Sequence, residues 1–159
     1  MRKASALAAL LLLVSPAAAR RDDPLEKHFK EADALIERAA YAQAREELLT
    51  ARAEFKTDDA RLVRYHERIG AIWLREGKVK EARGAFLAAL QEARRLGLSG
   101  LPVARADAGL GLCLRREKKD QYALRFFKKA LAEKPDEGTR MFVEDQIREI
   151  EGALPLPAR

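Results

Sequence analysis

The stretch GAIWLREGKVKEARGAFLAA, residues 70–89, decides the fold of this chain. It consists of helix-forming residues on both sides of a short break at Gly77. After the break, Ala82, Phe86 and Ala89 share one helical face, because they are spaced by four and then three positions. The two small side chains let a partner helix approach closely, and the ring between them fills the remaining space. The stretch therefore predicts a pair of antiparallel helices joined by a tight turn.

The same helical face recurs before and after this stretch. The equivalent residues are Ala44, Leu48 and Ala51 earlier in the chain, and Ala123, Phe127 and Ala130 later. The first alanines of the three sets are 38 residues apart from Ala44 to Ala82 and 41 apart from Ala82 to Ala123. A unit repeated at such a distance is typical of a helical repeat protein. We therefore expect three helix pairs.

The remaining sequence supports an all-α chain. Ala, Leu, Glu, Lys and Arg dominate after Pro24, and no alternating β-branched stretch predicts a strand. Glycine, proline and polar turn residues divide the chain into seven expected helices. These helices span residues 25–38, 41–55, 60–76, 79–96, 103–117, 120–133 and 137–152.

These recurring positions resemble the tetratricopeptide repeat (TPR) family. The second pair carries the pattern at Gly70, Trp73, Gly77, Val79, Ala82, Phe86 and Ala89, and the third at Gly111, Ala123, Phe127, Ala130 and Pro135. The first pair matches at Tyr41, Ala44, Leu48 and Ala51, with Ala32 in place of the packing glycine. The resemblance covers residues 25–135 and implies a right-handed superhelical stack of antiparallel helix pairs, a TPR-like α-solenoid.

The resemblance also implies repeat boundaries. We expect repeats at about 25–58, 63–96 and 104–137, and a last helix at 137–152 that caps the open end of the stack. The observed spacing exceeds the family period of about 34 residues. The extra residues are expected between repeats, at residues 57–61 and 96–102.

The first nineteen residues have the three-part layout of a secretory signal peptide. Basic Arg2 and Lys3 precede an apolar run at 6–14, and small residues at 17–19 predict cleavage after Ala19. The apolar run is shorter than the roughly 20 residues that span a bilayer. We therefore expect an exported protein, in the bacterial periplasm or outside the cell, with no stable membrane insertion after cleavage. An uncleaved N-terminal anchor is the alternative.

The resulting domain plan is a signal peptide at 1–19, a short linker at 20–24, a helical domain at 25–152 and a flexible tail at 153–159. Removing the signal lowers the Lys+Arg count from 31 to 29 against 25 Asp+Glu, so the formal net charge falls from +6 to +4. Acids and bases alternate along most segments, whereas nucleic-acid binders concentrate positive charge on one face. Nucleic acid is therefore not an expected partner.

No catalytic or metal-binding arrangement stands out. Cys113 is the only cysteine, and its apolar neighbours predict a buried thiol rather than a reactive one. His28 and His66 are 38 residues apart, one repeat distance, which favours a packing role over metal ligation. Ser99 lies in a glycine-flanked turn with no base nearby in the sequence. We expect no metal, no cofactor and no enzyme activity.

The resemblance implies a binding surface instead. In the TPR family the first helix of each pair lines a concave groove. The corresponding residues here are Phe29, Asp33, Ile36, Arg64, Glu67, Leu74, Arg75, Arg105, Leu112, Arg115 and Arg116. This groove is expected to be acidic with apolar spots at one end and basic at the other. Some family members hold a partner's C-terminal carboxylates with a clamp of lysine, asparagine and arginine, but Phe29 and Asp33 stand where that clamp begins, so this activity is not expected here.

Two functions fit these observations. The first is an interaction module of the bacterial cell envelope, which binds a segment of a partner protein, helical or extended, in its groove. The second is a structural component that assembles with further copies of itself. Neither function requires a catalytic site.

Overall fold

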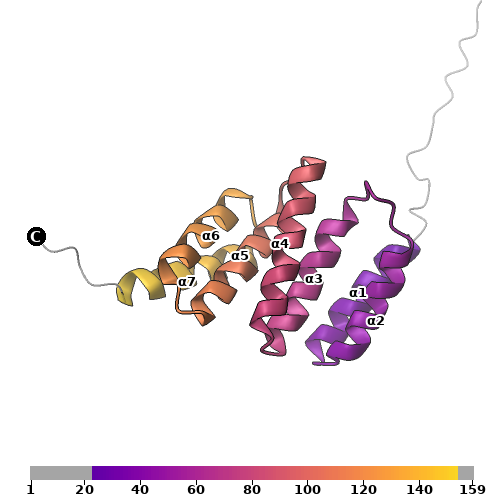
Figure 1. Ribbon diagram of the computed structural model, residues 1–159, viewed down its shortest axis with the longest axis horizontal. Coiled ribbons are helices and arrows are strands. Elements are labelled where there is room, and N and C mark those ends of the chain that lie inside the picture. The colour runs from indigo at the N-terminus through magenta and orange to yellow at the C-terminus, as the bar shows by residue number, and fades with distance from the viewer. Residues whose placement is uncertain (1–22, 154–159) are drawn as a thin grey trace, which may run out of the picture.

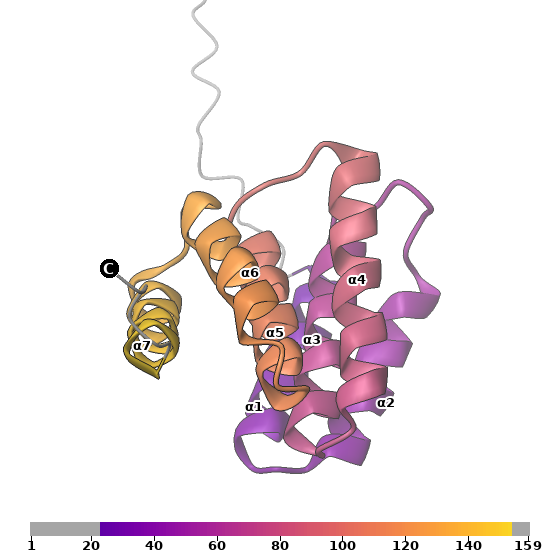
Figure 2. The same ribbon diagram turned by 60° about the vertical axis from the view of Figure 1, so that its left-hand side comes forward.

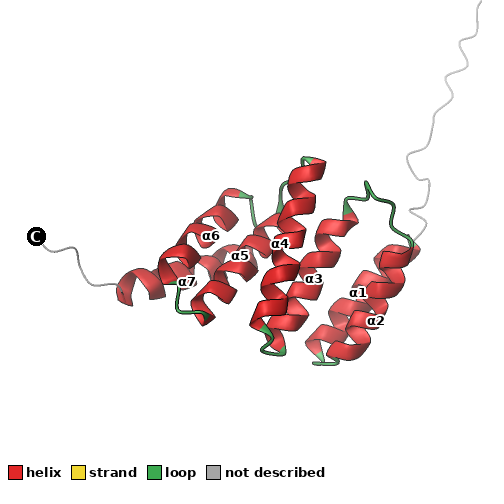
Figure 3. Ribbon diagram, viewed as in Figure 1, coloured by secondary structure: helices red, strands yellow, loops and turns green. Residues whose placement is uncertain are grey.

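The structure is a computed structural model that describes residues 23–153. The expected signal peptide and the tail after Ala153 lie outside this range. Seven helices and no strand form the described part of the chain (Figure 3). The helices are α1 (Pro24–Glu37), α2 (Tyr41–Ala53), α3 (Arg61–Arg75), α4 (Val79–Leu96), α5 (Leu101–Arg116), α6 (Asp120–Ala132) and α7 (Glu137–Ala153).

The helices stack as three antiparallel pairs followed by a single helix (Figure 1). The pairs α1/α2, α3/α4 and α5/α6 follow one another along the long axis, and α7 covers the last pair (Figure 2). The expected helix ends agree with the observed ones to within two residues. The start of α5 is one of the largest differences: Pro102 lies inside the first helical turn, where its missing N–H costs no hydrogen bond. The described residues form an all-α, TPR-like solenoid.

The repeated face predicted from the sequence is the core of each pair. All nine of its residues are at most 2% exposed, namely Ala44, Leu48, Ala51, Ala82, Phe86, Ala89, Ala123, Phe127 and Ala130. The three alanines that begin the sets are fully buried, so each second helix approaches its neighbours through a small side chain. The register of the predicted repeat is therefore confirmed.

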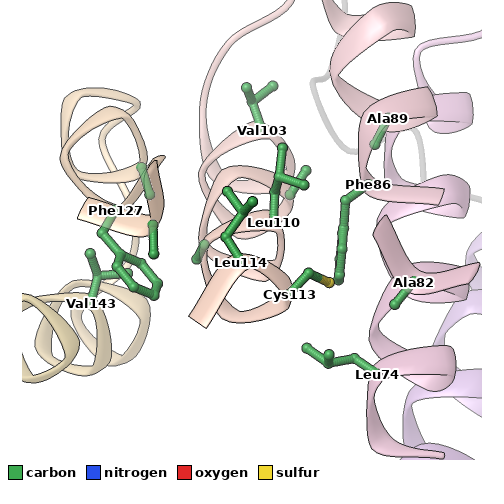
Figure 4. Packing of buried hydrophobic residues seen from close by; sticks show 14 of the residues in the cluster. Leu74, Ala82, Phe86, Ala89, Val103, Leu110, Cys113, Leu114, Phe127 and Val143 are labelled. Carbon is green, nitrogen blue, oxygen red and sulfur yellow. The ribbon is translucent and has the colours of Figure 1, made fainter. Parts of the chain in front are cut away.

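Phe86 joins the second pair to the third. Its ring lies between Gly70 of α3 and Gly109 of α5, and Figure 4 shows it in the layer where α4 faces α5. A Cβ added at Gly70 would lie 2.7 Å from the ring, and one added at Gly109 would overlap it. Both glycines are therefore needed for close approach rather than for a turn.

The turns within pairs share one backbone conformation. Ala39, Gly77 and Lys118 stand at the same repeat position, and all three have a left-handed φ of 58°, 78° and 60°. The extra residues of the long period lie between repeats, as expected. Residues 54–60 connect α2 to α3, and α4 is 18 residues long against 13 for α2.

Buried apolar residues form two separate clusters. The first contains residues of α1 and α2 together with Phe55 and with Leu62 and Ile72 of α3. The second runs from the opposite side of α3 through α4, α5 and α6 to α7. Cys113 belongs to the second cluster and is fully buried. Burial raises the pKa of its thiol to about 11, and the prediction of a buried thiol is confirmed.

Candidate binding groove

A continuous groove follows the first helices of the pairs. One hollow of about 510 Å³ lies between α3, α5 and the start of α7, and a neighbouring hollow of about 390 Å³ lies between α1, α3 and α5. The two share the lining residues Glu67, Ala71, Arg75 and Arg105. The groove therefore extends from the first repeat to the capping helix.

Most of the residues predicted from the sequence meet along this groove. The two hollows are lined by Asp33, Ile36, Glu67, Leu74, Arg75, Arg105, Leu112 and Arg116. Arg64 lines a smaller hollow beside α5, and Arg115 lines another next to Leu112. The first helices therefore bring these side chains to one surface, because each pair repeats the same orientation.

Phe29 is the exception among the predicted groove residues. Its ring is fully buried and stacks on Phe55, with 6.0 Å between the ring centroids. The guanidinium of Arg64 covers the ring at 4.2 Å from its centroid. Phe29 is a core residue and cannot contact a ligand in the groove, because the core of this small first pair needs its ring.

A buried carboxylate lies at the centre of the groove. Glu67 is only 4% exposed, and its Oε2 accepts a hydrogen bond from Arg68 at 2.5 Å. Burial raises the pKa of the Glu67 carboxyl, while Arg68 and Arg105 pull it in the opposite direction. Glu67 therefore serves to hold Arg68 in place more than to receive a ligand.

Several of the groove arginines pair with acids of the first helix or of the segment that contains the capping helix. Arg64 pairs with Glu26 at 2.7 Å. Arg105 pairs with Asp136 at 2.8 Å, and Arg115 pairs with Glu149 at 2.7 Å. Because of these pairs, fewer groove arginines carry uncompensated positive charge than the sequence alone predicted. The remaining positive charge is concentrated at two arginines.

Arg75 and Arg116 carry this remaining charge. They stand at the same repeat position, 41 residues apart, at the ends of α3 and α5. Within residues 23–153, neither pairs with a carboxylate, although Arg116 donates to the carbonyl of Leu74 at 2.7 Å. Both are exposed, and both line the larger hollow. Apolar residues lie beside them in that hollow, namely Ala71, Leu74, Ala108 and Leu112.

The capping helix contributes groove residues that the sequence reasoning missed. Asp136, Gly138, Thr139 and Phe142 line the larger hollow, and Phe142 is 40% exposed. The spacing of the sequence contained a signal for these residues. Arg105 and Thr139, which are in contact, are 34 residues apart, and this is the family period. This offset places α7 in the register of a fourth first helix, so its start lies along the groove.

The histidines have separate surroundings. His28 forms a hydrogen bond through Nδ1 with Glu47 at 2.7 Å, and His66 packs edge-on against Tyr65 with 5.0 Å between ring centroids. Burial lowers the pKa of His66. Within residues 23–153, no three potential metal ligands cluster together. In the same range, no helix combines the length and the apolar composition needed to cross a bilayer.

Comparison with solved structures returns TPR domains. The TPR2AB domain of yeast Sti1, in a complex with pHSP90, matches with a TM-score of 0.66 and 15% identity over 82% of this chain and 48% of that one. The N-terminal domain of stress-induced protein-1 (STI-1) from C. elegans matches with a TM-score of 0.57 and 16% identity over 78% of this chain and 94% of that one. This chain thus spans about half the length of the Sti1 fragment. No protein-family model and no curated protein matches the sequence. At these identities the likeness is one of fold, and it confirms the TPR-like architecture.

Proposed function

We propose that this chain is a non-catalytic interaction module that holds a segment of a partner protein in its groove. The observation that carries the proposal is the pair Arg75 and Arg116, which lack carboxylate partners within the described residues and border an apolar floor. The TPR2AB domain of Sti1, whose structure was solved in a complex with pHSP90, supports a peptide or protein as the ligand.

The groove favours a partner segment with a carboxylate beside an apolar side chain. The apolar side chain would cover Leu112 and Phe142, and the carboxylate would lie between Arg75 and Arg116. Each exposed charge pair contributes only about 0.2 to 1 kcal/mol. The arginines would therefore orient the segment and accelerate its approach, while apolar contact supplies most of the affinity.

The cellular setting is part of the proposal. Residues 1–19 support export through a signal peptide, which favours the envelope of a bacterium. Mass spectrometry of the protein purified from the periplasmic fraction tests this directly. We expect a mature N-terminus at Arg20, and a cytoplasmic chain that retains its N-terminal residues would overturn the envelope setting.

Site-specific cross-linking in cells tests the groove. A photo-reactive amino acid is placed at Leu112 or Phe142, and at Leu87 of α4 as the matched control, which is 45% exposed and lies outside the groove. We expect the two groove positions to give the same cross-linked partner and the control to give none. Equal cross-linking from all three positions would exclude the groove.

Charge reversal of the two arginines tests the proposed partner chemistry. The Arg75→Glu/Arg116→Glu variant should bind the identified partner about tenfold more weakly or worse, where tenfold corresponds to about 1.4 kcal/mol. The matched control is Arg38→Glu/Lys80→Glu, which changes the same net charge at exposed sites outside the groove. Equal losses in both variants would show an effect of net charge alone.

Light scattering on the mature chain separates this function from self-assembly, because a monomer across the micromolar range excludes self-assembly.

A further inference from the structure

The contact between the first helix and the third is electrostatic on the groove side. Three arginines of α3 face three acids, two on α1 and one at its N-cap, and we call these six residues the charged joint. Its pairs are Arg61 with Asp23 at 2.6 Å, Arg64 with Glu26 at 2.7 Å and Asp33 at 3.7 Å, and Arg68 with Asp33 at 2.5 Å. The arginines are three and four positions apart, so they form one stripe along α3.

The corresponding contact between α3 and α5 is different. There the ring of Phe86 lies against two glycines, Gly70 and Gly109, with no room for a further carbon atom at either. Well-packed apolar contacts of this kind have one arrangement, because a shift opens a void or creates an overlap. The second and third repeats are therefore fixed to each other.

Apolar contact across the charged joint is confined to one face of α3. Leu62 and Ile72 extend the first cluster onto α3, with Tyr65 and Ile69 packed beside them. The residues of α3 that belong to the second cluster, Val63 and Leu74, are not part of this contact. The first repeat thus meets α3 through one apolar contact and the charged joint, and Arg45 of α2 forms one further ion pair with Glu76 at 2.7 Å.

We propose that the first repeat rotates on this apolar contact and that the charged joint sets the width of the neighbouring half of the groove. The members of the joint are exposed to different extents: the side chains of Arg64 and Glu26 are 25% and 41% exposed, and those of Arg68 and Asp33 are 13% and 39% exposed. Such pairs contribute about 0.2 to 1 kcal/mol each and weaken with salt. The position of the first repeat therefore depends on ionic conditions, whereas that of the third does not.

The smaller hollow is the part of the groove that this rotation changes. It is lined by Asp33, Ile36 and Glu37 on one side of the joint and by Arg68, Ala71 and Arg75 on the other. A partner carboxylate that engaged Arg68 would compete with Asp33 and release α1. This role as a regulator of the groove rests on the proposed function, but the rotation itself needs no partner.

Single-molecule energy transfer on the full mature chain measures the rotation. Dyes at Arg38→Cys and Lys80→Cys report across the joint, and dyes at Lys80→Cys and Gln121→Cys report between the second and third repeats. All three sites are exposed, and buried Cys113 should take no label. Between about 0.1 M and about 1 M salt, the Debye length falls from about 10 Å to about 3 Å. We expect the first distance to increase or broaden and the second to stay constant.

Variants identify the joint as the cause. Arg64→Gln/Arg68→Gln should show the wide distance already at low salt and lose most of the salt response, because only the pair of Arg61 with Asp23 remains in the joint. Arg83→Gln is the control, because it removes the pair with Glu117 between the second and third repeats. A cross-joint distance that is unchanged by salt in the unmodified chain overturns the proposal, whether or not the variants fold. Because no partner is present, this result is independent of the cross-linking in cells.

Discussion

Asp107 is a buried acid without an obvious partner. It is 5% exposed on α5, and no hydrogen bond to its carboxylate is found among residues 23–153. The charged groups that act on its carboxyl are Lys129 of α6, Glu133 just after α6 and Arg94 of α4. Burial raises its pKa to about 6, and the two basic residues compensate only in part.

The Asp107→Asn variant should therefore be more stable than the unmodified chain at neutral pH. The folded-state pKa lies above the unfolded value of 3.8, so the folded state binds more protons between about pH 4 and 6. Below this pH range the Asp107 carboxyl is neutral, so the free-energy cost of burying its charge is absent. Above the range the carboxyl is ionised, and the full cost applies. We expect a gain of about 1 to 2 kcal/mol at pH 7 in urea unfolding, which disappears near pH 4. Asp58→Asn, at an exposed site, is the control; a gain at Asp107 that is independent of pH would contradict the assignment.

Some residue pairs could have been predicted from the sequence. Arg64 and Glu26 are separated by 38 residues, the local repeat distance, so opposite charges at one repeat position lie side by side. The burial of Phe29 could not be predicted from the sequence, because it depends on Phe55, which lies in the connection after α2. The same repeat position holds the exposed Phe142 in α7, so position alone does not decide burial.

At the level of helices, Gly109 and Gly84 should respond in opposite ways to alanine. A Cβ at Gly109 would overlap the Phe86 ring, which Gly70 blocks from the other side. We expect Gly109→Ala to lower the free energy of unfolding by about 1 to 3 kcal/mol or more. Gly84 lies within α4 with no atom near its missing Cβ, so Gly84→Ala should raise it by about 0.5 to 1 kcal/mol. Thermal or urea unfolding measures both, and equal effects would mean that Phe86 adjusts freely.

The helices themselves were predictable, because strong helix formers and a recurring face specify both their extent and their inner side. The register of α7 was less evident. Its outer positions carry charge, as expected of a cap, yet its first turns complete the larger hollow. A capping helix and a groove helix make the same amphipathic pattern, so only the 34-residue offset from Arg105 to Thr139 distinguishes them.

Across the whole molecule, stability should be highest at α5. Nearly all its residues from Val103 to Leu114 are buried, because it packs against α3, α4 and α6. The first pair has its own small cluster and is fixed to the rest through one face of α3. In native-state hydrogen exchange we expect amides of α1 and α2 to exchange faster than those in the middle of α5. Uniform protection across the chain would show that the two clusters unfold as one unit.

The ring of Phe86 also limits how this stack could be lengthened by design. The ring contacts Gly70 of its own repeat and Gly109 of the next, so a repeat copied from this chain keeps its packing only if the next repeat has a glycine where Gly109 stands. An extra repeat inserted between the second and third repeats would need this contact of a phenylalanine ring with a glycine at both of its boundaries. Inserted between the first and second repeats, it would need an apolar patch that matches Leu62 and Ile72 as well as a matching set of surface charges. The boundary between the first and second repeats is therefore the less demanding of the two for the insertion of a further repeat.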